Sequence, residues 1–107
     1  MRPDHFGANV ARGEAAFEVG GHKLIVRPSF AALVEAESEL GPLLALADRA
    51  AEGKLLLAEI AGLLWHCLAE RDGLTRDAIG EALVEGGVGA ALPALRAILR
   101  QVLAGSA

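Results

Sequence analysis

Glycines divide this chain into short segments and so limit what it can fold into. They stand at 41, 53 and 73, and Gly-Gly pairs stand at 20–21 and 86–87. Glycine weakens the interior of helices and strands and is favoured at their ends, so each of these positions predicts a boundary. We therefore expect short elements joined by turns.

The first glycine pair predicts a β-hairpin. It stands between two short β-prone runs, EAAFEV and HKLIVRP, and both glycines can take the positive φ angles of a tight turn. Alternation along the first run places Ala15, Phe17 and Val19 on one face, and Leu24 and Val26 share a face of the second. A two-stranded hairpin is marginal alone, so we expect its apolar face to lie on helices.

The rest of the chain predicts helices. The composition is 53% hydrophobic but only 4% aromatic, and its alanines and leucines are strong helix formers. Ser29 and Thr75 are suitable N-caps, and Phe30, Val34 and Leu40 recur at helical spacing with Leu33. The expected helices span 30–40, 42–52, about 56–70, 76–85 and about 89–103.

These elements predict one helix-dominated α+β domain, residues 14–107, in which an N-terminal two-stranded β-hairpin packs on about five short α-helices. The preceding residues, 1–13, lack periodicity and are expected to form a flexible arm.

Charge and composition favour a cytoplasmic protein that binds neither nucleic acid nor membrane. The net charge is −4, and residues 28–87 hold eleven acids against four bases, which repels nucleic-acid phosphates. A single cysteine cannot form an internal disulfide, no signal peptide is evident, and no apolar run is long enough for a membrane span. Acidic and basic regions also leave self-association open.

Trp65, His66 and Cys67 are adjacent, which raises the question of a cysteine nucleophile. On a helix, neighbouring side chains point about 100° apart, so the thiol and the imidazole do not face each other. Cys67 shares the apolar stripe of Ile60 and Leu64, where a thiol is unreactive. We expect a core cysteine and a solvent-facing His66; a small Cys/His enzyme is the remote alternative.

No other pattern predicts chemistry, so we expect no catalytic residue, no cofactor and no metal. His66 and Glu70 are one helical turn apart but lack further ligands. The run GGVGAAL lacks the spacing of a nucleotide-binding loop. The candidate partner contacts are therefore apolar, with core packing as the alternative for each: Trp65, Leu92, Leu95, Leu99 and Val102.

The order of these features resembles a small family of phage tail and gene-transfer-agent proteins, named either tail tube protein or tail assembly chaperone. The similarity covers about residues 7–103. It is carried by Asn9, Arg12-Gly13-Glu14, Gly20-Gly21, Arg27, the 30–40 helix with Glu35 or Glu37, Leu44, Leu46, Arg49 and Gly53.

The resemblance implies a non-enzymatic role in building a phage-like tail. As a chaperone, the chain would bind the tape-measure protein through apolar helix faces. As a tail tube component retained in the particle, it would use hairpin edges and charge asymmetry to form rings, although it is short for a tube subunit, whose usual build is a larger β-sandwich. The implied partners are the tape-measure protein, the tail tube protein, or both.

Overall fold

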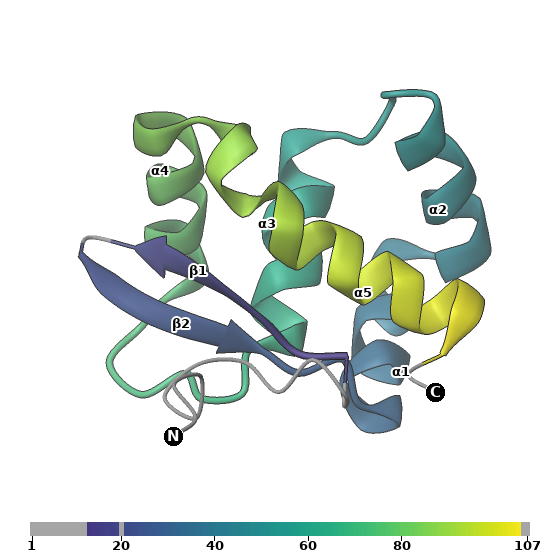
Figure 1. Cartoon of the computed structure of the whole chain (residues 1–107), viewed down its shortest axis with the longest axis horizontal. Helices are drawn as coiled ribbons and strands as arrows, with labels where there is room; N and C mark the ends of the chain where they lie inside the picture. The colour runs from purple at the N-terminus through teal and green to yellow at the C-terminus, as the bar shows by residue number, and fades with distance from the viewer. Residues whose placement is uncertain (1–12, 20, 106–107) are drawn as a thin grey trace, which may run out of the picture.

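The computed structural model describes residues 13–19 and 21–105. All but the last residue of the predicted arm, 1–13, lies outside the described part. A hairpin is followed by five α-helices, which confirms the predicted helix-dominated α+β class (Figure 1). The elements are β1 (Ala15–Val19), β2 (His22–Val26), α1 (Phe30–Leu40), α2 (Leu43–Ala51), α3 (Leu57–Cys67), α4 (Arg76–Gly86), the 3-10 turn η3 (Val88–Ala91) and α5 (Leu92–Ala104).

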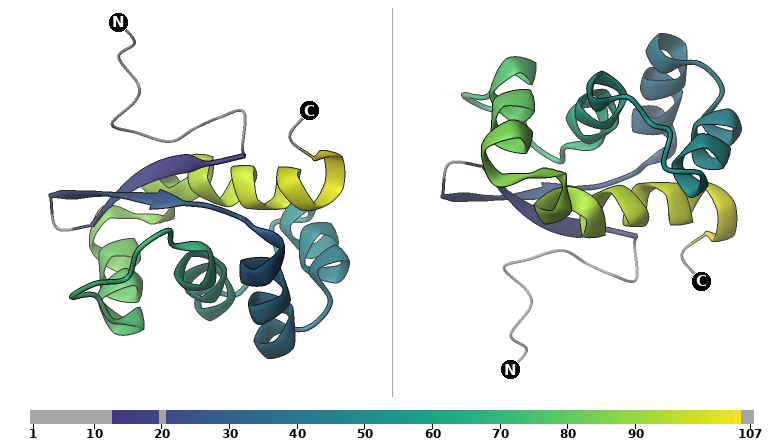
Figure 2. Two further views of the ribbon diagram at one scale, coloured as in Figure 1. Left: turned by 90° about the horizontal axis from the view of Figure 1, so that it is seen from below. Right: turned by 90° about the horizontal axis from the view of Figure 1, so that it is seen from above.

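The elements form two layers. The hairpin and α5 lie side by side in one layer, and α1 to α4 lie on one side of it (Figure 2). Within the helical layer, α3 packs between α1 and α4 and also reaches α5. This central position brings α3 into contact with three other helices.

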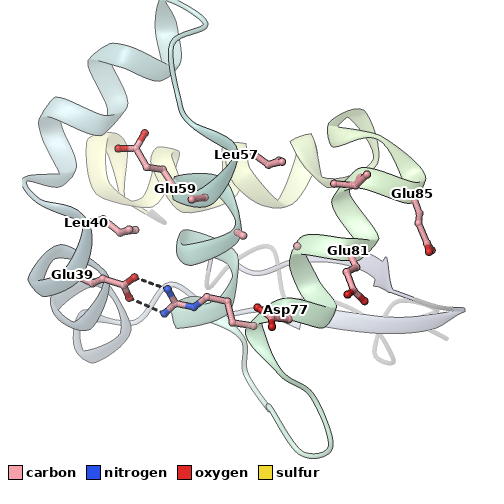
Figure 3. Close-up of a pocket in the computed structure, with 12 residues that line it drawn as sticks. Glu39, Leu40, Leu57, Glu59, Asp77, Glu81 and Glu85 are labelled. Atoms are coloured by element: carbon pink, nitrogen blue, oxygen red, sulfur yellow. Dashed lines mark hydrogen bonds and ion pairs between the residues drawn. The ribbon is translucent and has the colours of Figure 1, made fainter.

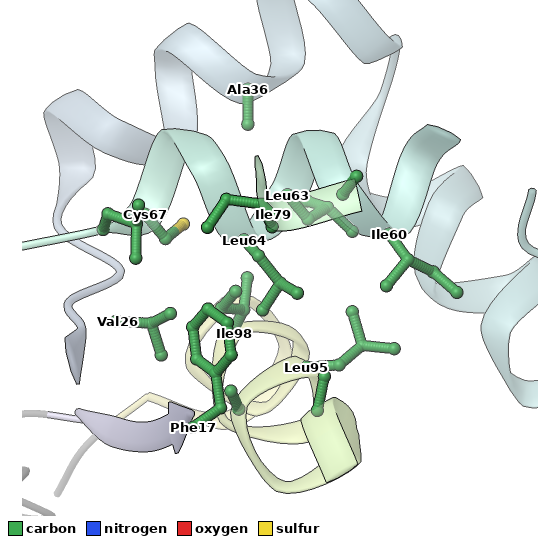
Figure 4. Close-up of a cluster of buried hydrophobic side chains, with 14 of the residues drawn as sticks. Phe17, Val26, Ala36, Ile60, Leu63, Leu64, Cys67, Ile79, Leu95 and Ile98 are labelled. Atoms are coloured by element: carbon green, nitrogen blue, oxygen red, sulfur yellow. The ribbon is translucent and has the colours of Figure 1, made fainter. Parts of the chain in front are cut away.

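The hydrophobic core lies between the two layers. Leu63, Leu64 and Cys67 of α3 are completely buried, and Ile98 of α5 and Val26 of β2 close the core from the other layer (Figure 4). Burying apolar side chains of this size is the main source of folding free energy. The core thus joins the hairpin to the helices.

The hairpin buries the face predicted for it at Phe17, Leu24 and Val26; the side chain of Val19, assigned to the same face, lies outside the described part of the structure. Its strands are antiparallel, with Phe17 opposite Leu24 and Ala15 opposite Val26. Phe17 and Val26 are buried, and Leu24 packs against the core. Alternation alone identified this face because a strand repeats every two residues.

Both predicted N-caps are confirmed. The Ser29 hydroxyl accepts a hydrogen bond from the Ala32 amide at 3.2 Å, and the Thr75 hydroxyl accepts one from the Ala78 amide at 3.1 Å. Each bond satisfies an amide that has no partner within its own helix. The starts of α1 and α4 are fixed by these two residues.

The predicted inward face of α1 was partly wrong. Phe30 is 83% exposed and Val34 is 44% exposed, whereas Ala36 is completely buried. Leu33 and Leu40 pack against the core, so the inward stripe of α1 runs through Leu33, Ala36 and Leu40 at helical spacing. Gly62 of α3 leaves room for Leu40, because a Cβ on Gly62 would stand 3.1 Å from a methyl carbon of Leu40.

The third helix ends earlier than the predicted Glu70. It stops at Cys67 because Leu68 is extended and forms an antiparallel bridge with Val26. The Ala69 amide donates to the Ile25 carbonyl at 2.9 Å. These pairings with β2 replace a further helical turn, and periodicity within the segment could not reveal them.

The final helix is also shorter than predicted, because the 3-10 turn η3 precedes it. Pro93, the second residue of α5, is compatible with a first turn, where no backbone amide donor is needed. Within the described residues, no single helix has the length and apolar content of a membrane span. Two consecutive segments, Arg76–Gly86 and Val88–Ala104, reach that length and apolar content together, but the chain bends by 119° between them.

Candidate partner-binding site

Cys67 is a core thiol. Its side chain is completely buried beside leucines of α3, and burial raises the pKa of the thiol to about 12. A thiol becomes a good nucleophile only as the thiolate, which burial opposes. These surroundings match the interpretation of Cys67 as a core residue.

The expectation that His66 faces solvent was wrong. Its side chain is only 13% exposed, and Nε2 lies 2.7 Å from a Glu39 carboxylate oxygen. An Arg76 nitrogen lies 3.2 Å from the same Nε2. Helix α1 covers this face of α3, so His66 lies where α1, α3 and α4 meet.

Among the described residues, no group of three or more His, Cys, Asp or Glu side chains is placed to hold a metal ion.

Trp65 is half-buried and packs against the core. The Arg71 guanidinium carbon lies 4.9 Å from the centroid of its ring, which is cation–π geometry. The indole thus already has neighbours within its own chain. Its role as a partner contact stays a prediction.

The four apolar residues predicted as contacts on the last helix differ in burial. Leu95 is 6% exposed and belongs to the core. Leu92, Leu99 and Val102 are half-buried and pack against it. These three side chains are therefore still partly accessible to a partner. That they contact a partner protein stays a prediction.

A groove of about 840 Å³ opens between α3 and α4, beside the end of α1 (Figure 3). Leu57 and Val84 line it from the two helices and are 45% and 69% exposed. Leu40, Ala58 and Ala61 add further apolar lining. Large exposed apolar side chains that gather in one hollow are typical of an interaction surface.

Carboxylates line the α4 side of the groove. Asp77, Glu81 and Glu85 recur every four residues and therefore share one face of α4 (Figure 3). None of the three takes part in a salt bridge among the described residues. This helix thus offers a row of negative charges beside the apolar surface.

The remaining two carboxylates of the groove are paired. Glu39 accepts hydrogen bonds from the Arg76 guanidinium at 2.5 and 2.7 Å. The hydrogen bond from Arg76, and to a smaller extent the one with His66, lowers the pKa of Glu39 to about 2. Glu59 accepts hydrogen bonds from Arg49 at 2.6 and 2.8 Å, which chiefly lower its pKa to about 2. Both stay ionised at neutral pH, but a cation already faces each.

Gly80 stands in the middle of α4 and lines the groove. A Cβ at this position would meet no heavy atom within 4 Å. Glycine inside a helix costs roughly 1 kcal/mol relative to alanine, and packing within the described residues does not require it. The position instead leaves room for close approach from outside.

Sequence reasoning missed this groove, although its signals were present. The four-residue spacing of the α4 carboxylates and the mid-helix Gly80 are both visible in the sequence. The burial of Ile79 and Leu83 leaves Val84 on the outer side of the same helix. The pairing of α4 with α3, however, requires the tertiary structure.

Comparison with known protein families gives a match over most of the chain. The family model described as phage tail tube protein, GTA-gp10, matches residues 12–105. The chain belongs to this family. The resemblance inferred from the order of sequence features is thereby confirmed. No curated protein and no solved structure matches the chain.

Membership of this family bears on what kind of molecule the groove binds. The GTA-gp10 family consists of phage and gene-transfer-agent tail proteins, which implies interactions with other tail components. Such a family is generally non-enzymatic. An apolar groove with a charged wall is a feature suited to binding another protein.

Proposed function

We propose that this member of the GTA-gp10 family is a tail assembly chaperone that binds the tape-measure protein before the tail is complete. It acts in the cytoplasm and is non-enzymatic. The observation that carries the proposal is the exposed apolar groove between α3 and α4 in a protein of a tail family. A long helical partner needs such a surface to cover its apolar stripe.

The arrangement of the helices supports this role. Leu57 and Val84 are large, apolar and exposed on two neighbouring helices, and that exposure is unfavourable unless a partner covers it. Trp65 and the outer part of the α5 stripe, Leu92, Leu99 and Val102, are further candidate contacts for the tape-measure or the tail tube protein.

The second candidate is a structural tail tube component that stays in the particle. The family description, which names a tail tube protein, favours it. In that role the chain would contact further copies of itself and would be present in stoichiometric amount. The two candidates therefore differ in where the protein is found after assembly.

Co-expression tests the proposed function. The tape-measure protein of the same tail gene cluster is produced alone and together with this chain, and its soluble fraction is measured. We expect co-expression to raise the soluble fraction and the two proteins to co-purify. An unchanged soluble fraction, with this chain itself folded and abundant, would overturn the chaperone role.

Mass spectrometry of purified particles tests the alternative. A chaperone is released, so we expect the protein to be present in lysates and absent or strongly substoichiometric in particles. Its recovery at the same copy number as the tube subunits would instead establish the structural role. A known tube subunit from the same particles serves as the internal standard.

A further inference from the structure

We propose that the groove between α3 and α4 is the docking surface for one amphipathic helix whose apolar stripe is flanked by lysine or arginine residues. The inference rests on the proposed function and deepens it, because it assigns the binding surface and the charge pattern of the partner. The surface differs from the contacts expected from the sequence at Trp65 and on α5.

The apolar part of the groove fixes the kind of partner. Leu57 and Val84 face the groove from α3 and α4, with Ala58 and Ala61 beside them, and in Figure 3 Leu57 extends from the start of α3 toward α4. Two helices with small residues between their larger ones can hold the ridge of a third helix. Apolar anchors at spacings of three and four residues would fill this groove.

The charges of the groove determine which charged residues should flank the apolar stripe of the partner helix. Asp77, Glu81 and Glu85 form a row without salt-bridge partners among the described residues, whereas Arg76, which also lines the groove, is bound to Glu39. A partner with basic residues at a similar spacing would pair with the row, and an acidic partner would be repelled. Charge complementarity therefore selects a basic amphipathic helix.

Gly80 adds an independent steric argument. It lies in the groove wall between Asp77 and Glu81, and a Cβ added there would meet no heavy atom within 4 Å. The free protein would gain helix stability from alanine at this position. A helix seated in the groove explains the glycine, because the backbone of α4 can then approach the partner closely.

A second copy of this chain fits the groove less well. Among the described residues, an apolar face that carries an arginine lies on α5, where Arg96 and Leu103 adjoin α2. That face is itself hollowed, by a cavity of about 340 Å³ lined by Ala47, Ala50 and other residues. Two hollows do not complement each other in shape, so we assign the groove to a different partner.

Synthetic peptides test the charge pattern without the native partner. Two peptides of about 20 residues share one leucine–alanine helical stripe and carry either lysine or glutamate on its flanks. Binding is measured by fluorescence anisotropy, and the bound surface by amide chemical shifts. We expect the lysine peptide to bind at least about tenfold more tightly at low salt, to weaken with added salt, and to shift amides of α3 and α4. Equal binding of the two peptides, or shifts confined to other elements, would overturn the proposal.

Matched variants then test the groove. Gly80→Leu fills it, and Gly86→Leu is the control, because Gly86 is an exposed residue of the same helix, outside the groove, with equal space around it. We expect Gly80→Leu to lose at least about tenfold in affinity and Gly86→Leu to keep it. Circular dichroism and thermal unfolding of both variants confirm that they are folded. Equal affinity of the two folded variants would contradict the assignment.

A charge-matched pair of triple variants separates local from net charge. Asp77→Asn, Glu81→Gln and Glu85→Gln together should weaken lysine-peptide binding. The control removes three exposed carboxylates outside the groove, with the changes Glu18→Gln, Asp48→Asn and Asp72→Asn. If both triple variants weaken binding equally, net charge alone drives it and the proposal fails.

Co-expression of the same variants with the tape-measure protein distinguishes the two proposals. Loss of solubilisation by Gly80→Leu but not Gly86→Leu would support both. Solubilisation that survives Gly80→Leu and the groove triple variant would overturn the groove assignment and leave the chaperone role standing. No solubilisation by the unaltered chain would overturn the chaperone role, while the peptide experiment still decides the groove. Concentration-dependent dimerisation that Gly80→Leu abolishes would assign the groove to a second copy.

Discussion

The Glu39 carboxylate, near the end of α1, accepts two hydrogen bonds from the guanidinium of Arg76, the first residue of α4. The same carboxylate meets His66 of α3. Three helices that are distant in sequence are thus held at one point, at the rim of the groove. Because bidentate arginine–carboxylate pairs fix geometry as well as charge, this contact helps to set how α1 and α4 stand against α3.

Acid should destabilise the fold through this carboxylate and Glu59. The pKa of each is lowered from 4.5 to about 2 in the folded protein. Their contribution to the free energy of unfolding is therefore present above about pH 4.5 and is lost as the pH falls toward 2. Urea unfolding measured between pH 7 and pH 2 should show this decrease.

Glu39→Gln should reduce the free energy of unfolding at pH 7. It should also make this free energy fall less steeply between pH 7 and pH 2, because one of the two titrating groups is removed. Glu18→Gln, at an exposed strand position, serves as the control and should keep the original pH dependence. An identical pH profile for Glu39→Gln and the unaltered protein would contradict the role given to the ion pair.

Truncation of Leu64 should strongly destabilise the protein. This side chain is completely buried at the centre of α3, and Leu64→Ala would leave a cavity in the core. We expect a loss of about 2–5 kcal/mol in the free energy of unfolding, measured by urea denaturation. The control, Leu103→Ala, removes a leucine that is 64% exposed and should change stability by less than about 0.5 kcal/mol. Similar losses in both variants would contradict the assigned core.

Two helical glycines should respond oppositely to substitution. Gly62 lies against Leu40, so Gly62→Val should push α1 from α3 and cost about 1–3 kcal/mol. Gly80 has open space around it, so Gly80→Ala should stabilise the free protein by about 0.5–1 kcal/mol. Thermal unfolding of both variants checks these signs. A destabilised Gly80→Ala would show that the position is constrained within the fold.

Cys67 should react slowly with a thiol reagent at neutral pH. Burial raises its pKa to about 12, so little reactive thiolate is present, and the reagent cannot reach the sulfur in the folded state. We expect labelling by a chromogenic disulfide reagent to accelerate with urea in parallel with unfolding. Rapid labelling of the native protein would revive the enzyme hypothesis, for which His66 would then be examined.

Local signals predicted much of the fold. Ser29 and Thr75 mark helix starts through a hydrogen bond that spans only three residues. Phe17 and Val26 follow the two-residue repeat of a strand. Such features depend on neighbours in the sequence, so a single sequence reveals them.

The errors arose where distant segments meet. The inward face of α1 depends on its packing against α3, where Leu40 lies against Gly62, and the end of α3 depends on the pairing of Leu68 with Val26. His66 is covered because α1 folds back over α3. The groove has the same origin, since its walls belong to helices whose relative position no local pattern specifies.

The bridge from Leu68 to Val26 has a consequence for assembly. An unpaired strand edge is a template on which another chain can add a strand. Here the stretch after α3 occupies part of the free edge of β2, and α5 lies along β1. Copies of this domain are thereby hindered from joining edge to edge into a continuous sheet. A tube built through the hairpin would first require these segments to move away, whereas recognition through helix faces uses the fold as it stands.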